Sequence, residues 1–206
     1  AGAESMLLSA LDLVPESMNI GYKLARLYYD SGQRQRGLRY MDERGMVARA
    51  VPLPAAPSVD GDLDEPAWAN VEPLTDFYQC IFRMSATPTE GRAEAYVGYY
   101  GQTLYFLIKG YEPSTAGIVA TATQRDSRVY TDDCIEIFLD TNHDSRTFFQ
   151  YIVNTLGAYI DDDDGQGGQG RSWNSEIDIG TAVADTFWTV EVAIPAAQLK
   201  EASFSP

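Results

Sequence analysis

Residues 125–164 read RDSRVYTDDCIEIFLDTNHDSRTFFQYIVNTLGAYIDDDD, and this stretch decides the fold. Apolar and polar side chains alternate on both sides of an acidic turn, and the apolar set is Ile135, Ile137 and Leu139 before the turn and Phe149, Tyr151 and Val153 after it. Alternation with a period of two is the pattern of a strand with one buried face. The stretch therefore predicts two or three adjacent antiparallel strands.

The other face of these strands carries residue types that suit a sugar. Tyr130 precedes the first strand, Glu136 lies on it, and Asn154 ends the second strand. An aromatic ring packs against the C–H face of a sugar, and a carboxylate or carboxamide hydrogen-bonds to the sugar hydroxyls. An ordinary antiparallel pair with a solvated outer face accounts for the same pattern, so both interpretations stay open.

Two further residues are candidates for the same site. Arg125 adjoins it next to Asp126, and Trp173 follows the segment DDDDGQGGQG at 161–170 and could supply a second ring. Each has a structural alternative, an ion pair for Arg125 and the anchoring of a loop on the core for Trp173. The segment itself is too polar and glycine-rich to pack, so we expect a loop there.

The turn between the two strands has the spacing of a calcium loop. Asp140, Asn142 and Asp144 place oxygen ligands at positions one, three and five, but the glycine and the distal glutamate of an EF-hand are missing. Asp60 and Asp62 could contribute ligands in the same way. The alternative is that Asp and Asn side chains cap the turn. Calcium is the one cofactor that the sequence suggests.

The alternation continues through the later part of the chain. It recurs at residues 93–100, 104–109, 177–179 and 188–194, with a turn at Gly101 and an end at Pro195. Many short strands without intervening helices are typical of a β-sandwich. We therefore expect a mainly β protein, with an antiparallel β-sandwich over residues 59–206.

Residues 1–50 have a helical pattern. Apolar residues recur every three or four positions up to Pro15, and two further helices are expected, up to Gly32 and up to Gly45. The order of small, bulky and turn residues at Ala25, Tyr28 and Gly32 resembles a tetratricopeptide repeat. An amphipathic helical hairpin is the alternative. Either form could bind a protein partner.

Residues 51–58 are expected to form a linker. Pro52, Pro54 and Pro57 lie within the segment VPLPAAPS, and prolines at this density favour an extended, semi-stiff chain. The predicted organisation is thus a helical segment at 1–50, a linker at 51–58 and the β-sandwich at 59–206.

The charge distribution limits which classes of partner the chain can bind. The net charge is -15, and residues 1–50 contribute +1 from six acids and seven bases, so the remainder carries -16 from 24 acids and eight bases. Binding to phosphates needs the opposite sign, so we expect no nucleic acid. No run of about 18 apolar residues exists, so we expect no membrane span. Like-charge repulsion for solubility, or calcium binding, would account for the acidity.

The few cysteines and histidines suggest no catalytic or zinc site. Cys80 and Cys134 are far apart in apolar contexts, which fits two buried thiols or a single disulfide, and we favour thiols because the core is large. His143, the only histidine, lies in a polar turn without a nucleophile beside it, so a catalytic triad or a haem ligand is not expected.

Five motifs in order resemble carbohydrate-binding module family 9 and its DOMON-like relatives. The opening signature is SVDGDLDEPAW from Ser58 to Trp68, and the others are Leu104-Tyr105-Phe106, DDCIEIFLD at 132–140, QYIVN at 150–154 and WTVEVAIP at 188–195. The resemblance covers about residues 55–200. It implies a non-catalytic β-sandwich that binds sugars, often with calcium bracing its loops.

The resemblance also assigns roles to single residues. It places one of two clamping rings at Tyr130 and the strand carboxylate at Glu136. The partner ring would come from a segment after Pro206, so the domain is expected to be incomplete at its C-terminus. An arginine that the family can place in the next strand is absent, and Ile152 lies at about that position.

Two functions are compatible with these sequence features. The first is a non-catalytic module that recognises a glycan on an exposed sheet face through Tyr130, Glu136 and Asn154, and that belongs to a larger extracellular or periplasmic protein. The alternative is a structural or assembly protein in which the helices bind a partner and the sandwich is a spacer. An enzyme would need a catalytic domain outside residues 1–206.

Overall fold

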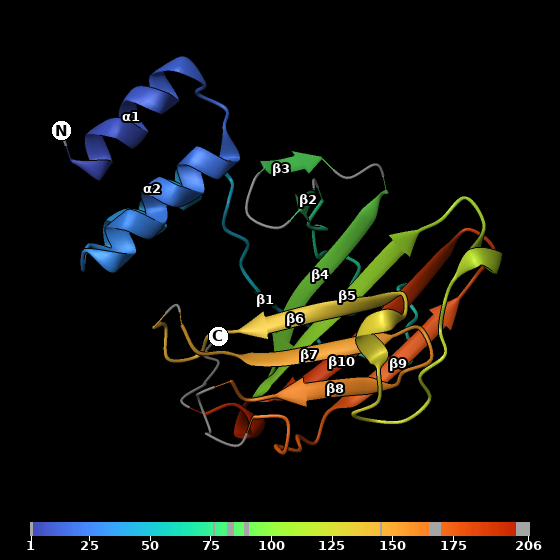
Figure 1. The fold of residues 1–206 in the computed structure, drawn as a ribbon. Coiled ribbons are helices and arrows are strands. Elements are labelled where there is room, and N and C mark those ends of the chain that lie inside the picture. Colours follow the sequence, from blue (N-terminus) through green and yellow to red (C-terminus); the bar gives the residue numbers. More distant parts are fainter. Residues whose placement is uncertain are drawn as a thin grey trace. The chain divides into compact units, whose positions relative to one another are not determined.

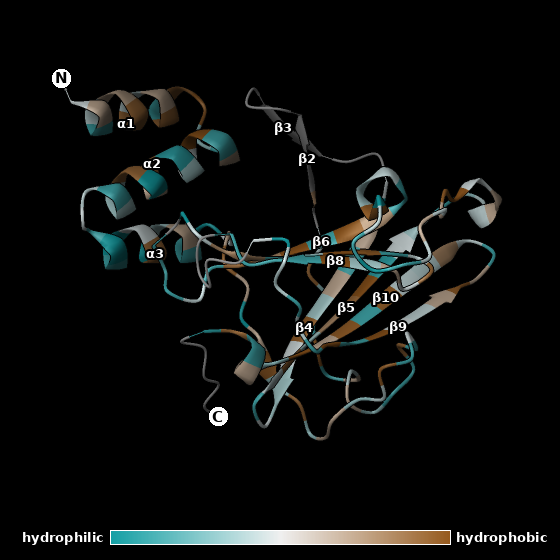
Figure 2. Ribbon diagram, turned by 60° about the horizontal axis from the view of Figure 1, so that its bottom comes forward, coloured by the Kyte–Doolittle hydropathy of each residue, from teal (hydrophilic) through white to brown (hydrophobic). Residues whose placement is uncertain are grey.

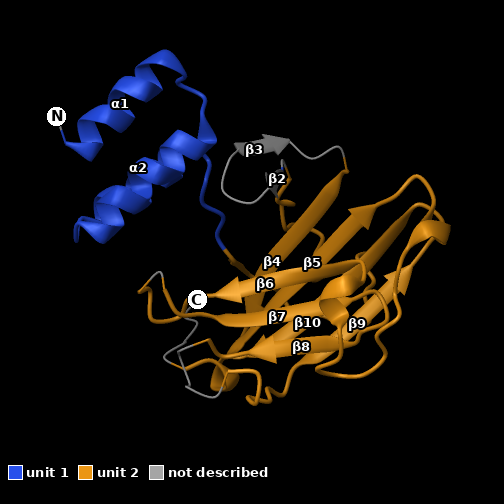
Figure 3. Cartoon of the chain, in the orientation of Figure 1, with its two compact units in different colours: residues 1–49, 76–89 blue, residues 50–75, 90–206 orange. Residues whose placement is uncertain are grey.

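The computed structural model describes residues 2–75, 77–81, 85–88, 91–144, 146–164 and 170–200, with the backbone alone at 78–81 and 85–88. The chain forms two compact units, which Figure 3 colours separately: residues 1–49 with 76–89, and residues 50–75 with 90–206. Each unit has its own hydrophobic core.

The described residues of the first unit form three helices, as the periodicity predicts: α1 (Ala3–Leu13), α2 (Met18–Asp30) and α3 (Arg34–Glu43). The Ser17 side chain caps α2 by accepting a hydrogen bond from the backbone nitrogen of Ile20. Leu11, Leu24 and Tyr28 form the core between the helices. The helical prediction is confirmed, whereas the assignment to a tetratricopeptide repeat stays a prediction.

The close packing of α2 and α3 depends on a glycine. A Cβ atom on Gly37 would lie 2.7 Å from the Tyr29 ring and 2.9 Å from the carbonyl oxygen of Ala25. A strand pair, β2 (Tyr78–Ile81) and β3 (Ser85–Pro88), belongs to the same unit. Neither strand is predicted from the sequence.

The second unit is built on a five-stranded sheet in the order β1-β4-β5-β10-β9. Its strands are β1 (Val51–Pro52), β4 (Ala93–Tyr100), β5 (Thr103–Tyr111), β9 (Asp178–Val183) and β10 (Phe187–Pro195). The pairing is antiparallel except between β1 and β4, which run parallel. We refer to it as the large sheet.

A second sheet of three antiparallel strands crosses the large one in Figure 1: β6 (Cys134–Leu139), β7 (Phe149–Asn154) and β8 (Tyr159–Asp162). We call it the small sheet. Its inner face and that of β10 share one core, formed by Ile137, Phe149, Tyr151 and Val153 with Trp188, Val190, Val192 and Ile194. The predicted β-sandwich is thereby confirmed. Figure 2 shows hydrophobic segments within the strands and more hydrophilic connections.

The residues that were predicted as a linker contribute to the second unit instead. Val51 and Pro52 form β1, and the buried Leu53 packs on Gly98, where a Cβ atom would lie 2.5 Å from the leucine side chain. Residues 53–71 then cover part of the outer face of the large sheet, with Trp68 against Tyr96 and Leu107. The chain bends at Pro54 and Ala55, and the packing of the partly buried Val51 and the buried Leu53 fixes the start of this segment to the sheet.

The predicted loop at 161–170 begins later than expected. Asp161 and Asp162 belong to β8, and Asp163 forms an isolated bridge with Gly170. Asp161 is fully buried because its carboxylate is satisfied by neighbouring donors. A run of aspartates looked too polar to pack, and the paired donors are what the sequence pattern did not reveal. Residues 165–169 lie outside the described part of the chain.

Across the described residues, no helix combines the length and the apolar character that a membrane crossing requires.

Candidate functional site

The outer face of the small sheet is covered at one end and open at the other. At the covered end, Ala122 and Val129 pack on Ile152 and Ile160. At the other end the strand register places Glu136 and Phe138 of β6, Gln150 of β7 and Asp162 of β8 on one surface, together with Phe148. We call these five residues the open face. Glu136 and Phe138 are exposed.

Tyr130 lies beside this sheet in the 3-10 turn η2 (Val129–Thr131). Its side chain is 50% exposed, while the preceding Val129 is fully buried against the sheet. Because Val129 is anchored, the Tyr130 ring projects from a fixed backbone rather than from a free loop. The ring is therefore exposed and does not lie in the core, while its role in stacking stays a prediction.

A buried carboxylate supports the turn that carries Tyr130. Asp132 accepts hydrogen bonds from the backbone nitrogens of Thr121 and Ala122 at 2.9 Å and from the Asn154 side-chain nitrogen at 2.8 Å. The bond from Ala122 comes first among the causes that lower the Asp132 pKa to about 2. Asp132 is therefore ionised near neutral pH and ties the covering segment to β7.

Asn154 does not belong to an exposed site, contrary to the prediction. It is fully buried, and its side-chain nitrogen donates to the Ala122 carbonyl oxygen and to Asp132. Its side-chain oxygen accepts from the backbone nitrogens of Leu156 and Ala158. The side-chain oxygen thus supports the turn after β7 and the side-chain nitrogen ties β7 to the covering segment, so the residue is structural.

Arg125 takes its structural alternative. Its Nε donates to Asp161 Oδ1 at 3.0 Å, and its Nη2 donates to Asp161 Oδ2 at 2.5 Å. The same carboxylate accepts from the backbone nitrogen and the hydroxyl of Ser175. The guanidinium also lies over the Tyr159 ring, 4.8 Å from its centroid. These contacts use Arg125 to neutralise a buried charge rather than to face a ligand.

Trp173 likewise anchors its segment on the core. Its ring lies 5.0 Å from the Phe149 centroid and 5.9 Å from the Tyr151 centroid, and both partners belong to the core between the sheets. The second ring that the sequence assigns to Trp173 is therefore not on the open face.

The open face contains an aromatic pair that was not predicted from the sequence. Phe138 is 53% exposed, and Phe148 meets it edge to face with centroids 5.1 Å apart. Next to this pair, Gln150 Nε2 donates to Glu136 Oε2 at 3.1 Å and orients the carboxylate. The signal was the alternation of Phe138 with Ile137, because it places an exposed ring two residues after Glu136 on the same face.

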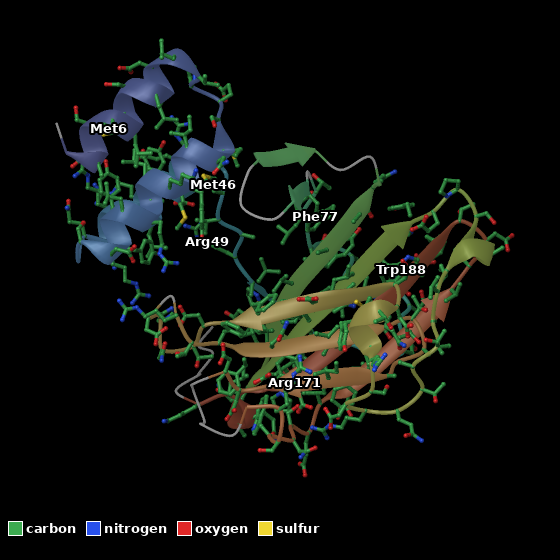
Figure 4. All side chains as sticks on the ribbon, viewed as in Figure 1. Met6, Met46, Arg49, Phe77, Arg171 and Trp188 are labelled. Carbon is green, nitrogen blue, oxygen red and sulfur yellow. The ribbon has the colours of Figure 1, made fainter. Side chains whose placement is uncertain are left out.

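Asp162 lies at the β8 edge of the open face and forms an ion pair with Arg171, with 3.6 Å between its carboxylate oxygen and the Arg171 Nε atom. Figure 4 labels Arg171. Burial raises the pKa of Asp162, and the nearby Asp164 acts in the same direction. This edge thus carries both signs of charge.

The turn at 140–147 uses its oxygens internally. Asp144 accepts from the backbone nitrogens of Arg146 and Thr147 at 2.7 and 2.8 Å, from the Thr147 hydroxyl and from the Asn142 side chain. The Asp140 and Asn142 side-chain oxygens both accept from the Asp144 nitrogen. These hydrogen bonds are those of a turn capped by its own Asp and Asn side chains, which is the alternative to a calcium loop. The Thr147 backbone hydrogen bond is foremost in lowering the Asp144 pKa to about 2.

Asp60 and Asp62 show the same behaviour. The Asp60 Oδ1 atom accepts from the Asp62 nitrogen at 2.8 Å, and Asp62 Oδ1 accepts from the Asp64 nitrogen at 2.9 Å. Over the part of the chain that the structure describes, no group of three or more His, Cys, Asp or Glu side chains could hold a metal ion. Calcium binding by either acidic segment stays a prediction.

Cys134 is a free thiol in β6, and burial raises its pKa to about 11. The side chain of Cys80 lies outside the described residues. His143 adopts a left-handed conformation, with φ of 58°, in the turn after β6.

A β-sandwich with rings and carboxylates on one open sheet face is the architecture of a carbohydrate-binding module. Residues 59–204 match the family described as "Carbohydrate family 9 binding domain-like", and the chain belongs to this family. Its members are non-catalytic carbohydrate-binding modules, in agreement with the predicted absence of enzyme activity. A search of curated proteins found no match. The DOMON-like relationship stays a prediction.

Solved structures share the fold. A family 9 carbohydrate-binding module from Caldicellulosiruptor kristjanssonii in complex with glucose is 23% identical, covers 71% of this chain and 68% of its own, and has a TM-score of 0.51. A family 9 carbohydrate-binding module from Caldicellulosiruptor kristjanssonii in complex with cellotriose is 24% identical, covers 72% of this chain and 67% of its own, and has a TM-score of 0.50. A putative carbohydrate-binding protein from Bacteroides uniformis has 15% identity, 76% and 75% coverage and a TM-score of 0.55.

Proposed function

We propose that this chain recognises a neutral glycan on the open face of the small sheet, next to Tyr130. The observation that carries the proposal is the strand register, because it brings the exposed Glu136 and Phe138 onto one surface with Gln150. The turn that bears Tyr130 is anchored on the covered half of the same surface. One surface then offers aromatic rings for the C–H faces of a sugar and hydrogen-bond acceptors for its hydroxyl groups.

The acceptor in this proposal is the Glu136 carboxylate. Gln150 donates to one of its oxygens, Oε2, and thereby fixes the side chain in one orientation. The second oxygen is then available for a sugar hydroxyl, in a charge-assisted hydrogen bond. A fixed carboxylate loses less conformational entropy on binding than a mobile one.

The Phe138–Phe148 pair lies beside the position where this chain departs from the family pattern. No arginine lies across from Glu136, since its partner in the register is the buried Ile152. A charged donor is therefore replaced by a hydrocarbon at that position. The exposed Phe138 ring, held edge-on by Phe148, supplies apolar contact area on the far side of Glu136. We infer an elongated site that favours an oligosaccharide over a single sugar unit.

Isothermal titration calorimetry on the intact chain tests the proposal. The ligands are glucose and cellotriose, which are bound in the two Caldicellulosiruptor structures, together with other neutral mono- and oligosaccharides. We expect binding of at least one oligosaccharide, and weakening by about tenfold in Tyr130→Ala and in Phe138→Ala, because each removes one stacking surface.

Tyr100→Ala is the matched control, since Tyr100 is a tyrosine of similar exposure, 48% against 50%, on the other sheet. It should leave the affinity unchanged. Failure of every sugar to bind at millimolar concentration would count against the proposal, as would equal affinity of Tyr130→Ala and the parent chain.

A second candidate function rests on the helical unit. Met6, Leu13 and Val14 are more than half exposed on α1 and at its end. Apolar side chains on one helix favour a protein-binding role, in which the sandwich would be a spacer. A pull-down with the intact chain tests this function. Capture of a defined partner that is lost in the double variant Met6→Asp with Leu13→Asp, without any response to sugars, would favour it over the first function.

We further propose that the chain works outside the cytoplasm as part of a larger protein. The support is the nature of the family, because a module for polymeric glycans acts where such glycans are accessible. Fractionation of the source cells with an antibody against this chain tests the location.

A further inference from the structure

The outer face of the large sheet contains a groove of about 370 Å³ that the open face does not explain. Its floor is a row across three strands, because the register aligns Lys109 of β5 with Thr189 of β10, and Thr189 with Ala182 of β9. Phe187 lies two residues before Thr189 on the same face. The groove therefore lies on the sheet opposite to the one that carries the open face.

One wall of the groove is the segment Asp60–Asp64, and this wall is fixed. The Glu191 carboxylate accepts from the backbone nitrogens of Asp60 and Gly61, and the Thr189 hydroxyl donates to the Gly61 carbonyl oxygen at 2.6 Å. A Cβ atom on Gly180 would lie 2.5 Å from the Asp60 backbone. The wall thus packs directly on β9 and β10, which makes the groove preformed.

The floor carries one cation and aromatic carbon. Lys109 Nζ lies 4.0 Å from the centroid of the Phe187 ring and 4.9 Å from that of Tyr111. Glu94, which is opposite Lys109 in the register, is engaged by Arg92 and by the hydroxyls of Tyr96 and Tyr111. Among the described residues, Lys109 has no ion pair, so the aromatic rings position its ammonium group for a ligand.

The rim carries acceptors. Asp60, Asp62 and Asp64 are all exposed and line the groove, and the turn hydrogen bonds use one oxygen each of Asp60 and Asp62. The remaining oxygens can accept from ligand hydroxyls. Phe187 and the exposed Val183 add an apolar surface beside them. The groove therefore combines one charged donor, several charged acceptors and an apolar patch.

This combination selects the class of ligand. Three carboxylates against one ammonium give the groove a net charge of -2, which disfavours anions, while Lys109 on the floor disfavours a simple cation. A neutral polyhydroxylated molecule satisfies both kinds of group. We propose that the groove is a second saccharide-binding site, independent of the open face, so that one module holds two segments of glycan on opposite sheets.

Nuclear magnetic resonance titration of the ¹⁵N-labelled intact chain tests the second site. The probes are the same neutral sugars as above, from glucose to cellotriose. We expect amide shifts at Gly61–Asp64 and Ala182–Ala184 that saturate separately from the shifts on β6 and β7. In Lys109→Met and in Asp62→Asn, the groove response should weaken by about tenfold, while the response of the open face stays unchanged.

The two sites are distinguished by the variant Tyr130→Ala with Phe138→Ala. Retention of the groove shifts in this variant supports the second site even if the open face binds nothing. Loss of both sets of shifts would mean that the groove amides respond only to sugar bound at the open face, and this overturns the proposal. Absence of groove shifts with every sugar, or groove shifts that survive both Lys109→Met and Asp62→Asn, also overturns it. Thermal unfolding of each variant verifies that it folds.

Discussion

The Glu191 carboxylate accepts a hydrogen bond at 3.0 Å from the indole nitrogen of Trp68, which lies 123 residues earlier in the chain. Both side chains are buried, and the same carboxylate accepts from the backbone nitrogens of Asp60 and Gly61. The last long strand of the large sheet thus holds the first segment of the sandwich. Both residues belong to motifs that are recognisable in the sequence, DEPAW and WTVEV.

The first prediction concerns the titration of Glu191. Burial raises its pKa to about 7 from an ordinary value of 4.5. Between these values the folded chain keeps a proton that the unfolded chain has released, so stability falls as the pH rises through this window, by up to about 3 kcal/mol. Glu191→Gln cannot titrate. Urea unfolding from pH 4 to pH 8 should show that the parent chain loses stability relative to this variant; parallel curves would contradict the assignment.

The second prediction concerns Asp132, whose pKa is lowered to about 2 by its hydrogen bonds. A carboxylate with a lowered pKa stabilises the fold above its unfolded value, near 3.8, and this stabilisation is lost as the pH falls toward 2. Asp132→Ala should therefore be less stable at neutral pH and should lose less of its remaining stability on acidification. Circular dichroism melts at pH 7, 4 and 3 measure both effects.

The control for Asp132 is Asp178→Asn, at an exposed position of β9. It should follow the parent chain at each pH. Because the Asp132 network fixes the turn that carries Tyr130, the glycan affinity of Asp132→Ala should also fall. An unchanged affinity in a destabilised but folded variant would show that Tyr130 does not depend on this network.

The third prediction separates structure from binding at Arg125. Removal of this guanidinium leaves the fully buried Asp161 carboxylate without its countercharge. We expect Arg125→Met to lower the free energy of unfolding by about 3–5 kcal/mol. The double variant Arg125→Met with Asp161→Asn should recover part of this loss. Calorimetry on the folded variant should give an unchanged sugar affinity; selective loss of affinity with normal stability would restore Arg125 to the binding site.

The fourth prediction concerns calcium at the turn 140–147. Because Asp144 is already satisfied by the amides and hydroxyl of its own turn, the melting temperature should be the same in millimolar calcium and in a chelator. Asp144→Ala should lower it equally in both. A calcium-dependent rise in the parent chain that is absent from Asp144→Ala would instead support the metal prediction from the Asp-x-Asn-x-Asp spacing.

The sequence predicts the sandwich well because alternation reports directly on which side chains are buried. Ile137 and Tyr151 fall on the inner face, as their alternation indicates. The sequence pattern misplaces Val51 and Leu53, because the density of prolines suggested a linker. A local pattern contains no information about the space beside Gly98 that the Leu53 side chain fills. Pairing between distant segments has to be seen in three dimensions.

The candidate site was harder to predict than the fold. Tyr130 and Glu136 are exposed, as their positions suggested. In contrast, Asn154 donates a hydrogen bond to Asp132, and Arg125 donates to Asp161. Polar residues at strand ends serve ligands and buried networks equally well, and only the identity of the hydrogen-bond partners separates the two uses. Phe138 was visible on the correct face, but an exposed phenylalanine looked unremarkable without Phe148 beside it.

The parallel pairing of β1 with β4 has a practical consequence for anyone who excises this domain. The family match begins at residue 59, but the folded unit begins at residue 50, where Val51 and Pro52 pair with β4, the Leu53 nitrogen donates to the Tyr99 carbonyl oxygen, and the Leu53 side chain is buried. A recombinant fragment that starts at the family boundary would uncover the side of β4 and the leucine-shaped hollow over Gly98. An expression plasmid should therefore encode the chain from Ala50 or earlier.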